Sequence, residues 1–232
     1  GEVCVIHIDL YPVGGARSIA LSMAAKEELE KAGILPHTTT PWSKFSQDDP
    51  SRFSSDTMEY YRENWDVVRA EMEKECSEYQ VGVELHAAYK DALICHSHRL
   101  YRSSVLTLFP YIEGEFRKAY HLKPGGKGYA SLREFRETLQ NVPAGVALNN
   151  VAPFRMMKML DEHFYEGVLS EEAVHQLSSD PIPNRHAALH GLIDYNSELN
   201  SLNTIIFASY FMSLVHSLKT YLKSYNESRS TP

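Results

Sequence analysis

Cysteine is scarce in this chain of 232 residues, which holds only Cys4, Cys76 and Cys95. Three scattered cysteines cannot build a disulfide framework, and none of them has the CxxC spacing of a zinc site. Long apolar runs are also missing, because the most apolar stretch, residues 202–218, is interrupted by Asn, Thr, Ser and His. No charged segment followed by an apolar run opens the sequence. We therefore expect a cytoplasmic protein with no membrane partner.

An excess of basic residues is absent as well. The chain has 23 Lys and Arg against 30 Asp and Glu, a net charge of −7. This balance argues against broad electrostatic binding of nucleic acid, which usually needs a basic face. However, residues 56–80 alone hold eight acidic and three basic residues, whereas residues 181–232 hold three acidic and four basic ones. A small site that grips one phosphate in the C-terminal part is therefore compatible with the charge.

What is present is the composition of a globular domain, 43% hydrophobic and 23% charged. Residues 18–32 are rich in Ala, Glu, Lys and Leu and end before Gly33, a residue suited to a left-handed helix cap. Residues 56–80 predict a long helix, because an apolar stripe recurs every three or four positions. The stripe consists of Met58, Tyr61, Trp65, Val68, Met72, Cys76 and Tyr79.

The remaining helices are predicted from similar signals. Residues 84–120 favour a long helix with a kink at Pro110, Ser170 is placed to open a short helix, and residues 197–225 favour the last long helix. Only residues 3–11, which are β-branched and apolar, favour a strand.

These patterns predict an all-α fold, a helical bundle. We expect an N-terminal extension or linker with one short helix over residues 1–55, an α-helical domain over residues 56–226 and a polar tail over residues 227–232.

The residues that stand out chemically form the segment Asn184-Arg185-His186-Ala-Ala-Leu-His190-Gly. His186 and His190 are four positions apart, so a helix places them on one face. Arg185 begins this helix, where free N–H groups and the helix dipole also favour an anion. A guanidinium and an imidazole together suit phosphodiester cleavage, because arginine stabilises charge on phosphorus and histidine moves protons near neutral pH.

This motif resembles that of the HEPN superfamily (higher eukaryotes and prokaryotes nucleotide-binding), in which an Arg at a helix start is followed four to six residues later by a His. Arg185 and His190 match it with four intervening residues, and His186 occupies the position where a polar residue is favoured. The segment around Glu113 is similar to the preceding helix of uncharacterised bacterial HEPN proteins. The resemblance extends over residues 84–225 and implies a HEPN-like helical bundle that forms a homodimer with the motif at the interface.

The same resemblance implies a function and a set of roles. HEPN proteins of this kind are metal-independent endoribonucleases that cleave RNA through its 2′-hydroxyl without a cofactor, in toxin, phage-defence or RNA-processing systems, some with an antitoxin partner. Arg185 is then the phosphate clamp, His190 the general acid or base, and His186 a polar orienter. Asn184 and Glu113 are expected to support them.

Other interpretations remain open. A non-catalytic HEPN-like module would bind a nucleotide or a protein in the same cleft, and a purely structural motif would pair Arg185 with a carboxylate such as Glu113. A metal site at the two histidines lacks a third ligand. We interpret Cys95-His96-Ser97-His98 as a structural or surface segment. Lys127 lies in a predicted turn, where its side chain could also contact RNA phosphate.

Overall fold

The computed structural model describes residues 16–119 and 167–230, and no strand occurs among them. This part of the chain is all-α, as predicted, while the strand expected in residues 3–11 lies outside the described residues. The helical elements are α1 (Ala16–Lys31), the 3₁₀ turns η1 (Trp42–Lys44) and η2 (Pro50–Arg52), α2 (Phe53–Glu63), α3 (Trp65–Ser77), α4 (Val83–Ser97), α5 (Tyr101–Ala119), α9 (Glu171–Ser178), α10 (Arg185–Leu189) and α11 (Glu198–Ser230).

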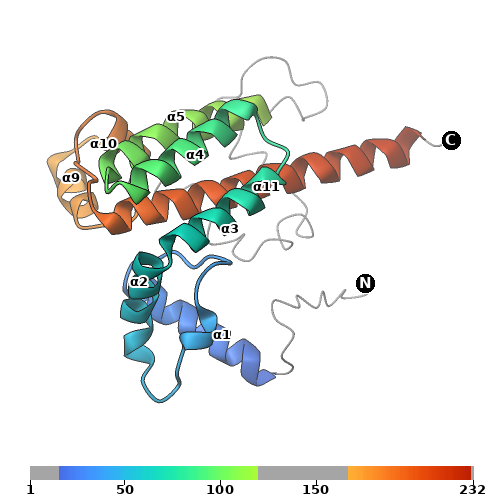
Figure 1. Ribbon diagram of the computed structural model, residues 1–232. Helices are drawn as coiled ribbons and strands as arrows, with labels where there is room; N and C mark the ends of the chain where they lie inside the picture. The colour runs from blue at the N-terminus through green and yellow to red at the C-terminus, as the bar shows by residue number, and fades with distance from the viewer. Residues whose placement is uncertain (1–15, 120–166, 231–232) are drawn as a thin grey trace.

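The long helix α11 is the axis of the bundle (Figure 1). α4 and α5 run along one side of it, α3 packs on another, and the short helices α9 and α10 gather near its N-terminal end. Nearly every residue from Asn200 to Val215 is buried. A helix buried around its whole circumference is a central helix, so α11 is more enclosed than the apolar stripe predicted for it.

The central helix buries polar side chains as well as apolar ones. Asn203 and Thr204 are at most 1% exposed, in the same stretch as Ile205, Ile206 and Phe207. Thr204 donates to the Asn200 carbonyl of the preceding turn. Buried polar groups of this kind need hydrogen-bond partners, and α11 finds several of them in loops that come from elsewhere in the sequence.

The segment after α1 is tied to α11 and to the loop before α10. Gly33 has a φ of +68°, as expected for the predicted cap, and a Cβ there would lie 2.1 Å from Cγ of Pro181. The buried Asn203 accepts from the Leu35 amide at 3.0 Å and donates to the carbonyls of Gly33 and Pro181, at 2.8 and 3.1 Å. One amide side chain therefore fastens the N-terminal segment and the loop before α10 to the same turn of α11.

The helix predicted over residues 56–80 is two helices, α2 and α3, which meet at Asn64. The Asn64 side chain donates to the Tyr60 carbonyl at 2.9 Å, which competes with continuation of the helix. The apolar stripe is nevertheless confirmed: Tyr61, Val68 and Met72 are buried on either side of the break. The prediction of a helix here was correct and its continuity was wrong, because the backbone of Asn64 leaves the helical conformation (φ −116°, ψ 19°).

The helix predicted over residues 84–120 is also two helices, α4 and α5. Arg99 between them has a φ of +60°, and the Leu100 and Arg99 amides donate to the carbonyls of Cys95 and His96 at 2.8 and 2.9 Å. This hydrogen-bond pattern ends a helix in a left-handed residue, usually glycine. Since no glycine marks the turn, the sequence pattern did not reveal it. α5 itself continues through Pro110.

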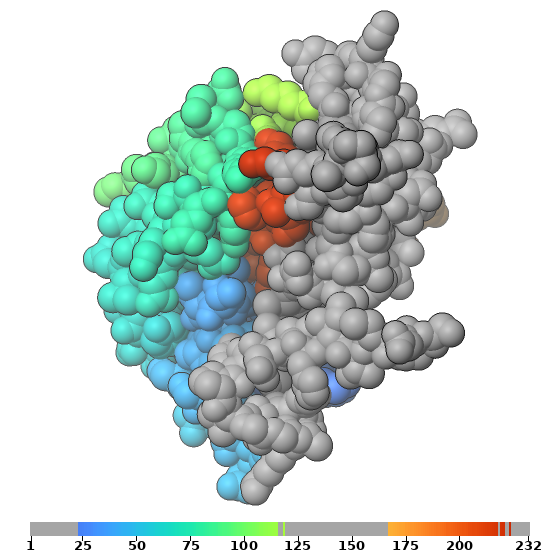
Figure 2. Space-filling view, turned by 90° about the vertical axis from the view of Figure 1, so that its right-hand side faces the viewer, coloured from blue at the N-terminus to red at the C-terminus, as the bar shows by residue number. Residues whose placement is uncertain are grey.

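Figure 2 shows the described surface from one side. The blue segment that follows α1 lies against the surface of α2 and α3, and part of α11 is visible between that segment and the end of α5. In the described residues, no helix combines the length and the apolar character that a membrane crossing requires.

Candidate functional site

The motif identified in the sequence lies on α10, a single short turn of helix that is capped at both ends. Asn184 has an extended backbone (φ −82°, ψ 130°), and its Oδ1 accepts from the Ala187 amide at 2.9 Å. Asn184 is fully buried, which shields this cap from water. The helix ends at Leu189, His190 is its C-cap residue, and Gly191 after it takes a φ of +66°. The predicted helix start is therefore confirmed, and Asn184 supports the motif as its N-cap.

Arg185 reaches from α10 to α5. Its Nη2 donates to Oε2 of Glu113, and the two side chains are 25% and 16% exposed. The ion pair fastens the motif helix to α5 and holds the guanidinium in one orientation. Both the catalytic and the purely structural interpretation of the motif predict this contact, so the contact alone does not decide between them.

His186 and His190 share one face of α10, as their spacing predicts. Their ring centroids are 4.5 Å apart with an interplanar angle of 76°. Nδ1 of His186 accepts from the Val168 amide at 2.8 Å, so in the neutral ring the proton is on Nε2. Partial burial, with the neighbouring His190 and Arg185, lowers the pKa of His186. His190 is exposed. One imidazole is thus fixed and neutral, and the other is open to solvent.

A pocket of about 330 Å³ lies next to the motif, between α5 and the turn that joins α10 to α11. Ala188 and Gly191, on either side of the exposed His190 along the chain, form part of its wall. Arg102 of α5 and Asp194 of the turn form a bidentate ion pair at the pocket. The remaining lining side chains are apolar or aromatic, from Val105, Leu106, Ile193 and Tyr195.

No group of three His, Cys, Asp or Glu side chains in the described part of the chain is arranged to hold a metal ion. The rings of the two motif histidines are 4.5 Å apart, and the carboxylate of Glu113 is engaged by Arg185. Within residues 16–119 and 167–230, the arrangement around α10 therefore consists of one guanidinium, two imidazoles and one carboxylate, without a set of three metal ligands.

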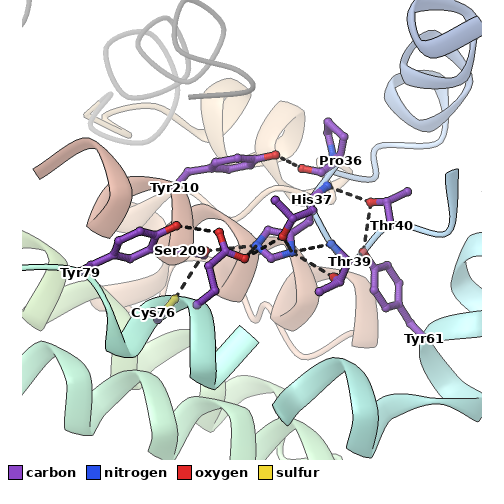
Figure 3. Close-up of polar contacts among 11 residues, drawn as sticks. Pro36, His37, Thr39, Thr40, Tyr61, Cys76, Tyr79, Ser209 and Tyr210 are labelled. Atoms are coloured by element: carbon purple, nitrogen blue, oxygen red, sulfur yellow. Dashed lines mark hydrogen bonds and ion pairs between the residues drawn. The ribbon is translucent and has the colours of Figure 1, made fainter. Parts of the chain in front are cut away.

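A second polar cluster was not anticipated from the sequence (Figure 3). At its centre His37 is 1% exposed, and its Nε2 lies 3.1 Å from Oγ of Ser209 on α11 and 4.0 Å from Oε2 of Glu75 on α3. Glu75 accepts hydrogen bonds from Tyr79 at 2.6 Å and from Thr38 at 2.7 Å. A serine, a histidine and a carboxylate thus meet at one point.

The protonation of His37 argues against a nucleophilic serine here. Nδ1 of His37 accepts from the Thr39 amide at 3.3 Å, so the neutral ring carries its proton on Nε2 and donates toward Ser209. A general base would need the reverse arrangement. Burial lowers the pKa of His37 to about 4 and raises that of the Cys76 thiol, 3.5 Å from Ser209, to about 12. The cluster therefore joins the residue 36–40 loop to helices α3 and α11 through a buried, neutral His37, with the Glu75 carboxylate at its partly exposed side.

Cys95-His96-Ser97-His98 is divided between core and surface. His96 is 8% exposed, its Nδ1 lies 2.8 Å from Oγ of Ser201, and its ring centroid is 4.1 Å from that of Trp65. Burial lowers the pKa of His96 to about 4. His98 is exposed. This geometry agrees with the structural interpretation of the segment.

The structure brings together five of the six residues singled out in the sequence: Asn184, Arg185, His186, His190 and Glu113. Lys127 lies outside the described residues. Sequence analysis missed the Arg102–Asp194 pair and the Val168 amide. Arg102 and Asp194 are 92 positions apart, so no local sequence pattern predicts their ion pair. Every residue except proline has a backbone amide, so the sequence does not reveal which amide contacts His186.

We compared the chain with protein-family models, with curated proteins and with solved structures, and none of them matches it.

Proposed function

We propose that this chain is a metal-independent endoribonuclease of the HEPN type, acting on RNA in the cytoplasm. The observation that carries the proposal is the meeting of Arg185, His186 and the exposed His190 along α10 and its C-cap, with Glu113 paired to the arginine. A fixed cation beside an exposed imidazole is the minimum that RNA cleavage through the 2′-hydroxyl requires.

In the proposed reaction, His190 takes the proton from the 2′-hydroxyl of the RNA. The 2′-oxygen then attacks the adjacent phosphorus, and the bond from phosphorus to the 5′-oxygen breaks. Arg185 stabilises the charge that grows on the phosphoryl oxygens. His190 of a second copy protonates the leaving 5′-oxygen, which requires a homodimer with the motif at its interface. The products are a 2′,3′-cyclic phosphate and a 5′-hydroxyl.

The supporting residues have distinct tasks in this proposal. Glu113 orients the Arg185 guanidinium through their ion pair, and Asn184 keeps the start of α10 in place through its cap. The lowered pKa of His186 keeps that ring neutral near pH 7, so it does not repel a second positive charge on His190. The biological setting that we propose is a toxin, phage-defence or RNA-processing role, in which an antitoxin would be a natural partner.

The test is cleavage of RNA by the purified chain in the presence of a metal chelator. We expect Arg185→Ala and His190→Ala to lower the cleavage rate by about 10²-fold or more, and a 2′-deoxy nucleotide at the cleaved position to block the reaction. His98→Ala removes another exposed imidazole that is not part of the motif and is the matched control. If the two motif variants fold and cleave as fast as the parent, the proposal is wrong.

The ion pair between Arg185 and Glu113 favours a second candidate, a HEPN-like module that binds a nucleotide or a protein without cleaving RNA. A guanidinium already neutralised by a carboxylate attracts a phosphate less strongly, and the chain as a whole is acidic. This candidate predicts no cleavage of any RNA, together with nucleotide binding that Arg185→Ala weakens.

A further inference from the structure

We propose that the pocket between α5 and the α10–α11 turn binds the nucleobase next to the cleaved phosphate, so that the enzyme recognises a base as well as the RNA backbone. The inference rests on the proposed function, because it assigns a second subsite to the same reaction. Its volume of about 330 Å³ is at the small end of the roughly 300–1,000 Å³ typical of ligand pockets. A pocket of this size suits one or two fused rings rather than a length of RNA.

The position of the pocket couples it to the motif. His190 stands directly before Gly191, and the wall includes both Gly191 and Ala188. His190 itself is not among the lining residues, but its Cα is only about 3.8 Å along the chain from that of Gly191 in the wall. A Cβ built on Gly191 would meet nothing within 4 Å, which leaves this wall open to an incoming group.

The pocket combines apolar faces with one polar edge. Val105, Leu106 and Ile193 offer aliphatic surface of the kind that contacts the faces of a planar ring. The polar edge is the Arg102–Asp194 pair, whose side chains are 61% and 49% exposed. The planar guanidinium, which the bidentate carboxylate holds in one orientation, also offers a face on which a base can stack.

Hydrogen-bonding capacity remains on that edge. A carboxylate has about four acceptor positions. Oδ1 of Asp194 accepts from Nε of Arg102, and Oδ2 accepts from Nη2 of Arg102 and from the Asn196 side chain. One acceptor position therefore remains, on Oδ1. Arg102 uses two of its five N–H groups in the pair. Adjacent donors and an acceptor match the mixed edge of a nucleobase, whereas a purely aliphatic ligand would leave them unsatisfied.

The test is a titration of the four nucleoside 5′-monophosphates, followed by NMR shifts of the Gly191 and Ile193 amides and by calorimetry. Leu106→Trp fills the pocket from a side chain that is 36% exposed, so the fold should tolerate it. Val67→Trp adds the same ring at a 57% exposed position on α3 and is the matched control. We expect Leu106→Trp to weaken binding of the preferred monophosphate at least tenfold and Val67→Trp to leave it unchanged.

Arg102→Ala is a second test variant, which removes the polar edge of the pocket without filling the pocket. We expect it to reduce the difference in affinity among the four monophosphates. If no monophosphate binds, or if Leu106→Trp binds as the parent does, the base subsite is wrong even when the chain cleaves RNA. If instead the monophosphates bind in the pocket and no RNA is cleaved, the proposed ribonuclease function is wrong, and the pocket is a nucleotide-binding site without a part in cleavage.

Discussion

Two histidine clusters at different depths of this molecule show how burial changes what the same side chain can do. Around α10, His186 and His190 lie near the surface beside an arginine and a pocket. Around His37, a second polar set of groups lies between α3, α11 and the loop after α1, and His37 at its centre is 1% exposed (Figure 3). The exposed His190 of the first cluster is accessible to a substrate, whereas the buried ring of His37 is enclosed by the elements that it joins.

The proton positions reinforce this contrast. Burial lowers the pKa of His37 to about 4, and its Nδ1 is committed to the Thr39 amide. The ring therefore remains neutral and fixed across the physiological pH range. His190, by contrast, has an exposed ring with a second imidazole as its neighbour. The comparison predicts that variants of one cluster change activity and that variants of the other change stability.

The largest effect is expected for His190→Ala. We expect RNA cleavage to fall by about 10²–10⁴-fold, the usual contribution of a general acid or base. Because the ring is exposed, the free energy of unfolding should change by less than about 0.5 kcal/mol. Cleavage assays with urea denaturation of the same preparation measure both. If His190→Ala instead lowers the free energy of unfolding as much as a core variant does, the predicted difference between the exposed and the buried cluster is wrong.

The opposite profile is expected for His37→Ala. This change leaves a cavity and removes the partner of Ser209, so it should lower the free energy of unfolding by about 2–4 kcal/mol. The residual cleavage rate of the folded fraction should match that of the parent. Thermal and urea denaturation check the first statement, with His98→Ala as the control at an exposed position. An unchanged unfolding midpoint would show that the His37 cluster does not stabilise the fold.

The pH dependence of stability gives a smaller effect. The pKa values of His37 and His96 are lowered to about 4 from an ordinary value of 6.5, so between these two pH values the unfolded chain binds protons that the folded chain does not. The free energy of unfolding must therefore decrease as the pH falls through this window. From pH 7 to pH 5.5 we expect a decrease of about 1 kcal/mol per histidine. Urea denaturation of the parent and of His37→Gln at both pH values should show a shallower decrease in the variant.

The smallest effect is expected at a helix cap away from the motif. Oγ of Ser170 accepts from the Ala173 amide at 3.2 Å at the start of α9, as Oδ1 of Asn184 does for α10. Ser170→Ala should lower the free energy of unfolding by about 0.5–1 kcal/mol and leave cleavage unchanged. Thermal denaturation and the cleavage assay check this. If Ser170→Ala lowers cleavage as strongly as a motif variant, the assay is reporting general stability.

Prediction from the sequence succeeded where the signal is local. Helix propensity and the apolar stripe of residues 56–80 placed the helices, Ser170 and Gly33 marked two of their ends, and Arg185 was correctly placed at the start of α10. It failed at the two helix breaks, because the Asn64 side-chain bond and the left-handed Arg99 have no strong residue signature. For the site, the spacing of the motif was enough to place its two histidines on one face of α10.

The sequence by itself determined the helical class, the caps and the motif turn, because all of these depend on residues within one or two turns of each other. The tertiary structure decided the contacts over long separations. Arg185 meets Glu113, Arg102 meets Asp194, and His37 meets Ser209 across 172 positions. These contacts depend on how helices pack around α11, and packing is set by the whole core rather than by any local pattern. Through that packing, one group of histidines lies at the surface and the other is buried.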